Sequence, residues 1–109
     1  MSRLILWGSM LVASVLAIGN AAAGDAVAGK AKAAVCAVCH GLNGIAKNPD
    51  APNLAGDNAN YIMKQLHAFQ SGIRKHEQMT IMAKSLSEQD VSNVAAWYSG
   101  LKVTVEMPH

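Results

Sequence analysis

The apolar positions between residues 57 and 72 recur at the spacing of a helix. They lie three and four residues apart and form one stripe: Ile62, Leu66 and Phe69. Asp57 or Asn58 is a suitable N-cap for this helix, because a short polar side chain can bond its free amides, and Gly72 is a suitable end. The pattern predicts an amphipathic helix that reaches to about Gln70 and buries this stripe.

A second amphipathic helix is predicted near the end of the chain. Its start has the arrangement of a capping box, with Ser87 at the cap and Asp90 three residues later. The apolar positions that follow share one face, which Trp97 widens: Val91, Val94, Ala95, Tyr98 and Leu101. We expect this helix to end at Gly100 or in the run of residues 103–105.

A third helix is predicted from about Asp25 to Ala34, with the Asp25 carboxylate at its positive end. Its apolar side is narrow: Ala26, Val27, Ala31, Ala34 and Val35. Gly29 interrupts the helix, and it either only lowers stability or marks a flat place where another helix crosses closely.

Two segments between these helices lack a regular period. Residues 41–56 are rich in Gly, Asn, Pro and Asp, the composition of a loop, and residues 73–86 show no helical repeat. No stretch alternates as a pair of strands would. The predicted fold class is all-α, with three to four helices.

The first 23 residues have the three parts of a secretory signal peptide. Arg3 lies in a short basic start, residues 4–18 form an apolar run, and residues 20–23 supply the Ala-x-Ala pattern of a cleavage site. An uncleaved membrane anchor is the alternative, but the run is shorter than the ~20 residues that a spanning helix needs. We expect cleavage after Ala23, export to the periplasm, a mature domain of residues 24–109 and no stable membrane insertion.

The mature chain is small and almost neutral. Removing residues 1–23 from a chain of 109 leaves 86, and the loss of Arg3 leaves eight basic against seven acidic side chains. This balance provides neither the basic surface of a nucleic-acid-binding protein nor a polybasic membrane patch. A domain of this size has a small hydrophobic core and often needs a disulfide, a metal or a bound cofactor to be stable.

The run Cys36-Ala37-Val38-Cys39-His40 matches the Cys-x-x-Cys-His motif of c-type haem attachment. Two thiols at this spacing can add to the two vinyl groups of one porphyrin, and His40 then follows as the proximal ligand of the iron. A redox disulfide or half of a zinc site is the alternative, but the sequence has neither a βαβ setting nor a second ligand pair. Both cysteines of the chain lie in this motif, so no structural disulfide remains. We therefore expect covalent haem c to stabilise the domain.

The second axial ligand of the iron must come from another segment of the chain. The side chains that could supply it are Met63, His67, His76, Met79 and Met82. Core packing explains Met63, an exposed helix face explains His67, and a run of charged neighbours makes His76 typical of a surface. Met79 and Met82 lie in the predicted loop before the last helix, and residue type and position do not separate them.

Further stretches extend the pattern around the motif. They are PNLAG at 52–56, YIMKQL at 61–66, Met79-Thr80, LSEQD at 86–90 and AAW at 95–97. With the residues before His40 they cover essentially the whole mature chain, which resembles the class I c-type cytochromes. The resemblance is to the small bacterial carriers of the c553 type and to one half of the dihaem c4 type. Because this chain has one motif and a c4-type protein has two, it is either a stand-alone carrier or a subunit.

The resemblance implies the small class I cytochrome c fold, wrapped around one haem c attached through Cys36 and Cys39. It also implies that Gly29 packs against the pair Trp97-Tyr98, where the first and last helices cross. These expectations concern the fold and the attachment of the cofactor.

The resemblance also implies roles for two residues outside the motif. Met79 is implied as the sixth ligand of the iron, with Met82 as its neighbour. The backbone carbonyl of Pro52 is implied as the acceptor for Nδ1–H of His40, a bond that fixes the orientation of the imidazole ring.

A low-spin iron held by histidine and methionine has no open coordination position, so we do not expect an enzyme. The function that fits is a periplasmic one-electron carrier that relays electrons between respiratory redox partners. One alternative is the haem c subunit of a periplasmic dehydrogenase with a flavin or molybdenum partner. Another is a gas-binding or sensing haem in which Met79 is weakly bound or absent.

Redox proteins are therefore the expected partners, in small and transient contacts. The contact would be a modest apolar patch with a charged rim. Six lysines could form that rim or belong to an ordinary solvated surface: Lys30, Lys32, Lys47, Lys64, Lys75 and Lys84.

Overall fold

The structure is a computed structural model that describes residues 24–109, so the predicted signal peptide lies outside the described residues. The helices of this part are α1 (Ala26–Lys32), α2 (Ala37–His40), α3 (Ala59–Ser71), α4 (Glu77–Lys84) and α5 (Glu88–Ser99). Residues 24–109 contain no strand, which confirms the all-α class for this part of the chain. None of these helices is long and apolar enough to cross a membrane.

Helix α3 begins and ends where the sequence predicts. The side-chain oxygen of Asn58 accepts hydrogen bonds from the backbone N–H groups of Asn60 and Tyr61, at 2.9 and 3.3 Å. Gly72 follows the last turn with a φ of 80°, a left-handed conformation that suits glycine and stops the helix.

Helix α5 also begins as predicted. Ser87 and Asp90 form a capping box, in which each side chain accepts from the backbone N–H of the other residue, at 3.1 and 3.0 Å. The helix ends before Gly100. Two of its free amides are therefore satisfied by local sequence alone.

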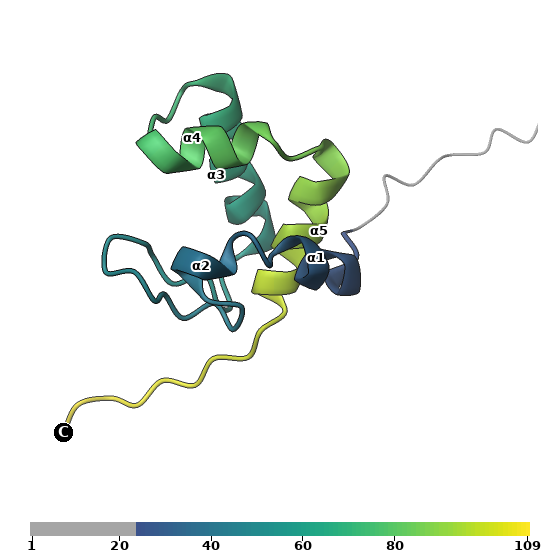
Figure 1. Ribbon diagram of the computed structural model, residues 1–109. Helices are drawn as coiled ribbons and strands as arrows, with labels where there is room; N and C mark the ends of the chain where they lie inside the picture. Colours follow the sequence, from purple (N-terminus) through teal and green to yellow (C-terminus); the bar gives the residue numbers. More distant parts are fainter. Residues whose placement is uncertain (1–23) are drawn as a thin grey trace, which may run out of the picture.

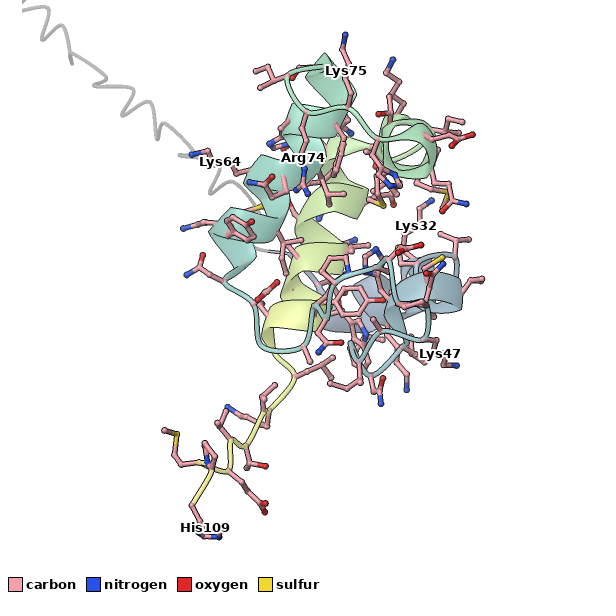
Figure 2. All side chains as sticks on the ribbon, turned by 90° about the vertical axis from the view of Figure 1, so that its left-hand side faces the viewer. Lys32, Lys47, Lys64, Arg74, Lys75 and His109 are labelled. Carbon is pink, nitrogen blue, oxygen red and sulfur yellow. The ribbon has the colours of Figure 1, made fainter. Side chains whose placement is uncertain are left out.

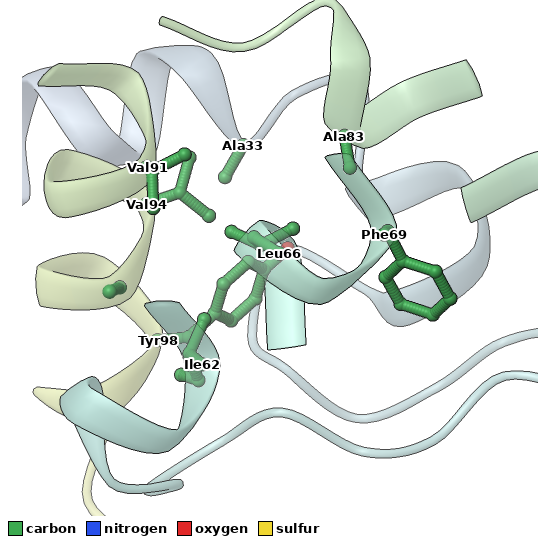
Figure 3. Close-up of a cluster of buried hydrophobic side chains, with 9 residues drawn as sticks. Ala33, Ile62, Leu66, Phe69, Ala83, Val91, Val94 and Tyr98 are labelled. Carbon is green, nitrogen blue, oxygen red and sulfur yellow. The ribbon is translucent and has the colours of Figure 1, made fainter. Parts of the chain in front are cut away.

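The core lies where α5 packs on α3 and α3 packs on α4 (Figure 3). Its buried side chains are Ala33, Ile62, Leu66, Phe69, Ala83, Val91, Val94, Ala95 and Tyr98. The predicted stripe of α3 is buried throughout, and so is the predicted face of α5 apart from Leu101 and Trp97, which are half-buried.

Helix α1 lies across α5 near the start of the extended C-terminal tail (Figure 1). A Cβ atom on Gly29 would collide with the backbone carbonyl of Asn93 and would lie 3.1 Å from Cβ of Trp97. The backbone N–H of Asp25 donates to Oδ1 of the same Asn93 at 2.8 Å. The close helix crossing at Gly29 is thus confirmed, with Asn93 and Trp97 rather than the Tyr98 ring against the glycine.

The predicted apolar side of α1 is wrong. Its members are exposed: Ala26, Val27, Ala31, Ala34 and Val35. The buried positions are Gly29 and Ala33, one turn apart. Alanine and valine occur on every side of this short helix, and the residue without a side chain decides which side approaches α5.

The segment 73–86 is not the irregular loop that was predicted, because it contains α4. This helix has only two turns and buries only Ala83, so its apolar residues are too few to produce a helical period. Helix α2 was not predicted either, since it is a single turn. Met79 and Met82 therefore lie on a helix and not in a loop.

Candidate haem-attachment site

The Cys-x-x-Cys-His motif forms one helical turn directly after α1. The N–H of His40 donates to the carbonyl of Cys36 at 2.9 Å, which closes this turn. Cys36 and Cys39 are three residues apart and so lie on the same side of the turn. Both thiols are free and half-buried, and Cys36 packs against the core. The two sulfurs are therefore available to one neighbouring group.

The surroundings of Cys36 do not favour a redox thiol. Burial raises the pKa of the Cys36 thiol above its ordinary value, while the ammonium group of Lys32 acts in the opposite direction. Reactive redox cysteines have a lowered pKa, since the thiolate is the nucleophile. The Cys36 thiol thus lacks the lowered pKa of a thioredoxin-like nucleophile.

His40 is 7% exposed and has one ring nitrogen fixed by the backbone. Its Nδ1 lies 2.9 Å from the carbonyl oxygen of Pro52, the contact that the resemblance implied. A carbonyl only accepts, so Nδ1 carries the proton and Nε2 keeps its lone pair. The hydrogen bond of the His40 ring within residues 24–109 is made by Nδ1 and leaves Nε2 unused. This is the arrangement of an imidazole ready to bind a metal through Nε2.

The loop of residues 41–56 holds the Pro52 carbonyl in place. The carbonyl of Gly44 accepts from the amide of Leu54 at 2.8 Å. The side-chain oxygen of Asn53 accepts from the amide of Ala46 at 2.7 Å. Because the two residues that follow Pro52 are tied within the loop, its carbonyl has a defined direction toward His40.

Two aromatic side chains of α5 hold the residues that follow His40, and the sequence analysis missed this role. The hydroxyl of Tyr98 donates to the carbonyl of Gly41 at 3.0 Å, and Nε1 of Trp97 donates to the carbonyl of Leu42 at 2.9 Å. Burial, with a smaller contribution from Cys36, raises the pKa of Tyr98 to about 12. A buried tyrosine or tryptophan usually needs a hydrogen-bond partner, which is the signal that could have found them.

The candidate sixth ligands have different surroundings. Met63 and Met79 are half-buried and pack against the core, together with Cys36 and Leu54. Met79 is one turn before the fully buried Ala83 and shares its inward face, whereas Met82 is half-buried and does not pack against the core cluster.

The two histidines among the candidate sixth ligands, His67 and His76, form hydrogen bonds elsewhere. Nε2 of His67 lies 2.9 Å from a carboxylate oxygen of Glu88. Nδ1 of the exposed His76 accepts from the first amides of α4. Each ring thus has at least one nitrogen committed to the protein itself.

These residues fit a covalently bound haem c. Two free thiols lie on one side of a helical turn, an imidazole with an available Nε2 follows them, and a thioether packs against the same core as the first thiol. Sulfur, imidazole and thioether are the donors that such a haem requires.

The cytochrome c family profile matches residues 21–102 of the chain. The chain is 42% identical over 91 residues to cytochrome c4 of Pseudomonas aeruginosa, covering 84% of this chain and 43% of that protein. It is 44% identical over 73 residues to a protein of Thiomonas intermedia named thiosulfate dehydrogenase electron acceptor, covering 65% and 33%. The crystal structure of reduced cytochrome c4 from Pseudomonas stutzeri superposes with a TM-score of 0.69, at 41% identity, over 76% of this chain and 48% of that one.

The chain spans less than half the length of these relatives. The matched residues include the motif, the loop and all five described helices, so the likeness covers the site as well as the fold. The cofactor is accordingly haem c, and the chain belongs to the cytochrome c family.

Proposed function

We propose that this chain is a periplasmic one-electron carrier whose single haem c is attached through Cys36 and Cys39. The iron is held between His40 and Met79, and electrons pass between redox proteins. The observation that carries the proposal is the 2.9 Å hydrogen bond between Nδ1 of His40 and the Pro52 carbonyl. It leaves the lone pair of Nε2 available to bind a metal, next in sequence to two free thiols. These groups fit a covalently attached haem and its iron better than hydrolysis or thiol chemistry.

Met79 is the sixth ligand in this proposal because of its place on α4. It shares the inward face of the helix with the buried Ala83 and packs against the core that Cys36 also touches. Met82 does not pack there, and His67 is bound to Glu88. Of the five candidate side chains, only Met63 has similar surroundings, and it lies in the middle of α3, where core packing explains it.

When bound, the haem supplies a reversible one-electron couple. The contributions of the chain are electrostatic and geometric. The Pro52 carbonyl fixes the His40 ring and increases its basicity, while the soft sulfur of Met79 and the apolar core favour the reduced iron. With His40 and Met79 both bound to its iron, the haem would have no position for a substrate, so the role that fits is electron transfer.

The surface supports brief contacts with redox partners. Lys32 forms an ion pair with Asp90 at 3.2 Å, and the ammonium group of Lys30 lies 5.5 Å from the ring centre of Trp97. The exposed Lys47, Lys64 and Lys75 are spread from the loop after α2 to the turn before α4 (Figure 2). This spread suits a weakly charged rim and not one dense basic patch.

A second candidate is the haem subunit of a dehydrogenase complex. The observation that favours it is the 44% identity to the Thiomonas protein named thiosulfate dehydrogenase electron acceptor. A subunit would elute with a large partner on gel filtration of a native extract, whereas a free carrier would elute alone. The two candidates share the same site chemistry.

Replacement of the two methionines of α4 tests the ligand set. Ferric haem with a thioether ligand has a weak absorption band at about 695 nm, called here the thioether band. We expect the Met79→Ala holoprotein to lose this band and to have a lower reduction potential, and the matched Met82→Ala holoprotein to keep both. Loss of the band in Met82→Ala alone would move the ligand to Met82, and a wild-type protein without the band would refute the assignment.

A further inference from the structure

Helix α4 is held differently at its two ends. Near its C-terminal end, Ala83 is 0% exposed, and the side-chain amide of Gln70 on α3 donates to the carbonyls of Ala83 and Leu86, at 2.9 and 3.1 Å. At the other end, Glu77 and Gln78 are exposed. In the first turn, Met79 is the hydrophobic side chain that packs against the core, and Thr80 is half-buried.

The first turn is closed by the imidazole of His76, the N-cap of α4. Nδ1 of His76 accepts from the backbone N–H groups of Gln78 and Met79, both at 3.2 Å. The backbone N–H of His76 donates in turn to Oγ1 of Thr80 at 3.0 Å, and its carbonyl accepts from the Thr80 amide at 3.0 Å. The cap is thus bonded directly to the backbone of the residue that we assign as the sixth ligand.

We propose that His76 is a positioning residue: by capping α4 it fixes the place of the Met79 thioether. The proposal rests on the proposed function, in which Met79 is an iron ligand. Histidine is not among the residues that usually cap helices, which are Ser, Thr, Asp and Asn. Here its ring nitrogen takes the position of their side-chain oxygen.

The physical argument concerns the state in which Met79 has left the iron. When the sulfur withdraws, the first turn of α4 is free to move or unwind, because Met79 is its hydrophobic contact with the core. That movement breaks the two hydrogen bonds to Nδ1 of His76. The cap therefore favours the bound state over the withdrawn state, and its loss should increase the withdrawn fraction about fivefold.

The withdrawn fraction can be measured with potassium cyanide as a competing ligand of the ferric holoprotein. Cyanide binds only when the sixth position is open, so its apparent dissociation constant is inversely proportional to the withdrawn fraction. We expect the constant to fall about fivefold in His76→Ala and to stay within about twofold of wild type in His76→Asn, whose side chain can cap.

Asn58→Ala is the matched control, because Asn58 caps α3 through the same two amide positions, at 2.9 and 3.3 Å. Its loss should lower global stability by a similar amount but leave the cyanide constant within about twofold of wild type. Global unfolding of each holoprotein is followed by far-UV circular dichroism, so that a local effect on α4 is separated from a general one.

Each outcome decides. An unchanged constant in His76→Ala overturns the proposal, and so does an equal fall in His76→Ala and Asn58→Ala. A fall in His76→Asn as large as in His76→Ala also overturns it, since the cap would then not be the cause. If His76→Ala yields no holoprotein, His76→Asn must restore both yield and constant, or the proposal fails. Failure of the proposed function would give a different result, because the wild-type protein would then lack the thioether band. Failure of the His76 proposal alone would leave a normal band in the wild type and an unchanged cyanide constant in His76→Ala.

Discussion

Replacement of Tyr98 by phenylalanine tests how the last helix holds the haem-attachment motif. The side chain of Tyr98 is 0% exposed, and its hydroxyl donates to the carbonyl of Gly41 at 3.0 Å. Gly41 directly follows His40 and is itself buried. The Tyr98→Phe change keeps the ring and removes only the donor, so the Gly41 carbonyl loses the hydrogen bond from Tyr98 and keeps the one from the Gly44 amide at 3.1 Å.

The cost follows from the loss of one hydrogen bond. A typical intramolecular hydrogen bond contributes about 0.5–1.5 kcal/mol, and burial of both residues suggests about 1 kcal/mol. The rise in the pKa of Tyr98 from 10.0 to about 12 is a separate quantity, which favours the neutral hydroxyl over the phenolate by about 3 kcal/mol. That figure is an upper bound, because part of it comes from Cys36, whose sulfur carries no charge once it is a thioether.

The raised pKa also gives the sign of the pH dependence. The unfolded chain releases the tyrosine proton near pH 10, while the folded protein keeps it to about pH 12. The stabilisation by Tyr98 is therefore complete below pH 10 and is lost as the pH rises toward 12. Tyr98→Phe lacks this loss, so the stability difference between the two proteins should narrow over the same range.

The assay is guanidinium unfolding of the ferric holoprotein at pH 7 and at intervals from pH 10 to 12. Tyr61→Phe is the matched control, because Tyr61 is 54% exposed, and we expect it to change the free energy of unfolding by less than about 0.5 kcal/mol. A Tyr98→Phe effect as small as that of the control at pH 7, or a difference that widens above pH 10, would refute the reasoning.

Three further variants test other contacts. Gly29→Ala should lower the free energy of unfolding by about 3 kcal/mol or more, because the new Cβ meets the Asn93 carbonyl and α1 must move away from α5; a thermal scan showing a loss under about 1 kcal/mol would contradict this. The hydrogen bond from the Ser87 amide lowers the pKa of Asp90, so its stabilisation is full above pH 3.8 and lost as the pH falls through the lower folded-state value. The stability of Asp90→Asn should therefore fall less steeply than that of the wild type between about pH 5 and 2. Parallel plots of stability against pH for the two proteins would count against the hydrogen bond between Ser87 and Asp90. Gln70→Ala removes two hydrogen bonds to carbonyls at the end of α4 and should cost about 1–2 kcal/mol in chemical unfolding, which an unchanged midpoint would disprove.

Local signals in the sequence were enough to locate α3 and α5. Asn58 and Ser87 act on amides two or three residues ahead, and Gly72 ends α3 through its own backbone conformation. None of these effects depends on the rest of the fold, so they could be predicted to within a residue. The motif Cys36 to His40 is equally local, because attachment needs only the spacing of its members.

The failures on α1 and at Tyr98 involve contacts between distant segments. The side of α1 that faces the core is decided by the carbonyl of Asn93, more than sixty residues further along the chain. Helix α4 depends on its cap His76 and on Gln70 of another helix, neither of which produces an apolar period. The role of Tyr98 could not be predicted without knowing that the Gly41 carbonyl would lie within hydrogen-bond distance of its hydroxyl.

The bonds that join α5 to α1 and to the residues after His40 have a consequence for the order in which the protein matures. The partners are 68, 57 and 55 residues apart in sequence. A chain that emerges from its N-terminus, at a ribosome or a translocation channel, presents both thiols before the residues of α5 have appeared. Attachment of haem can therefore precede the contacts that α5 makes with α1 and with the residues after His40.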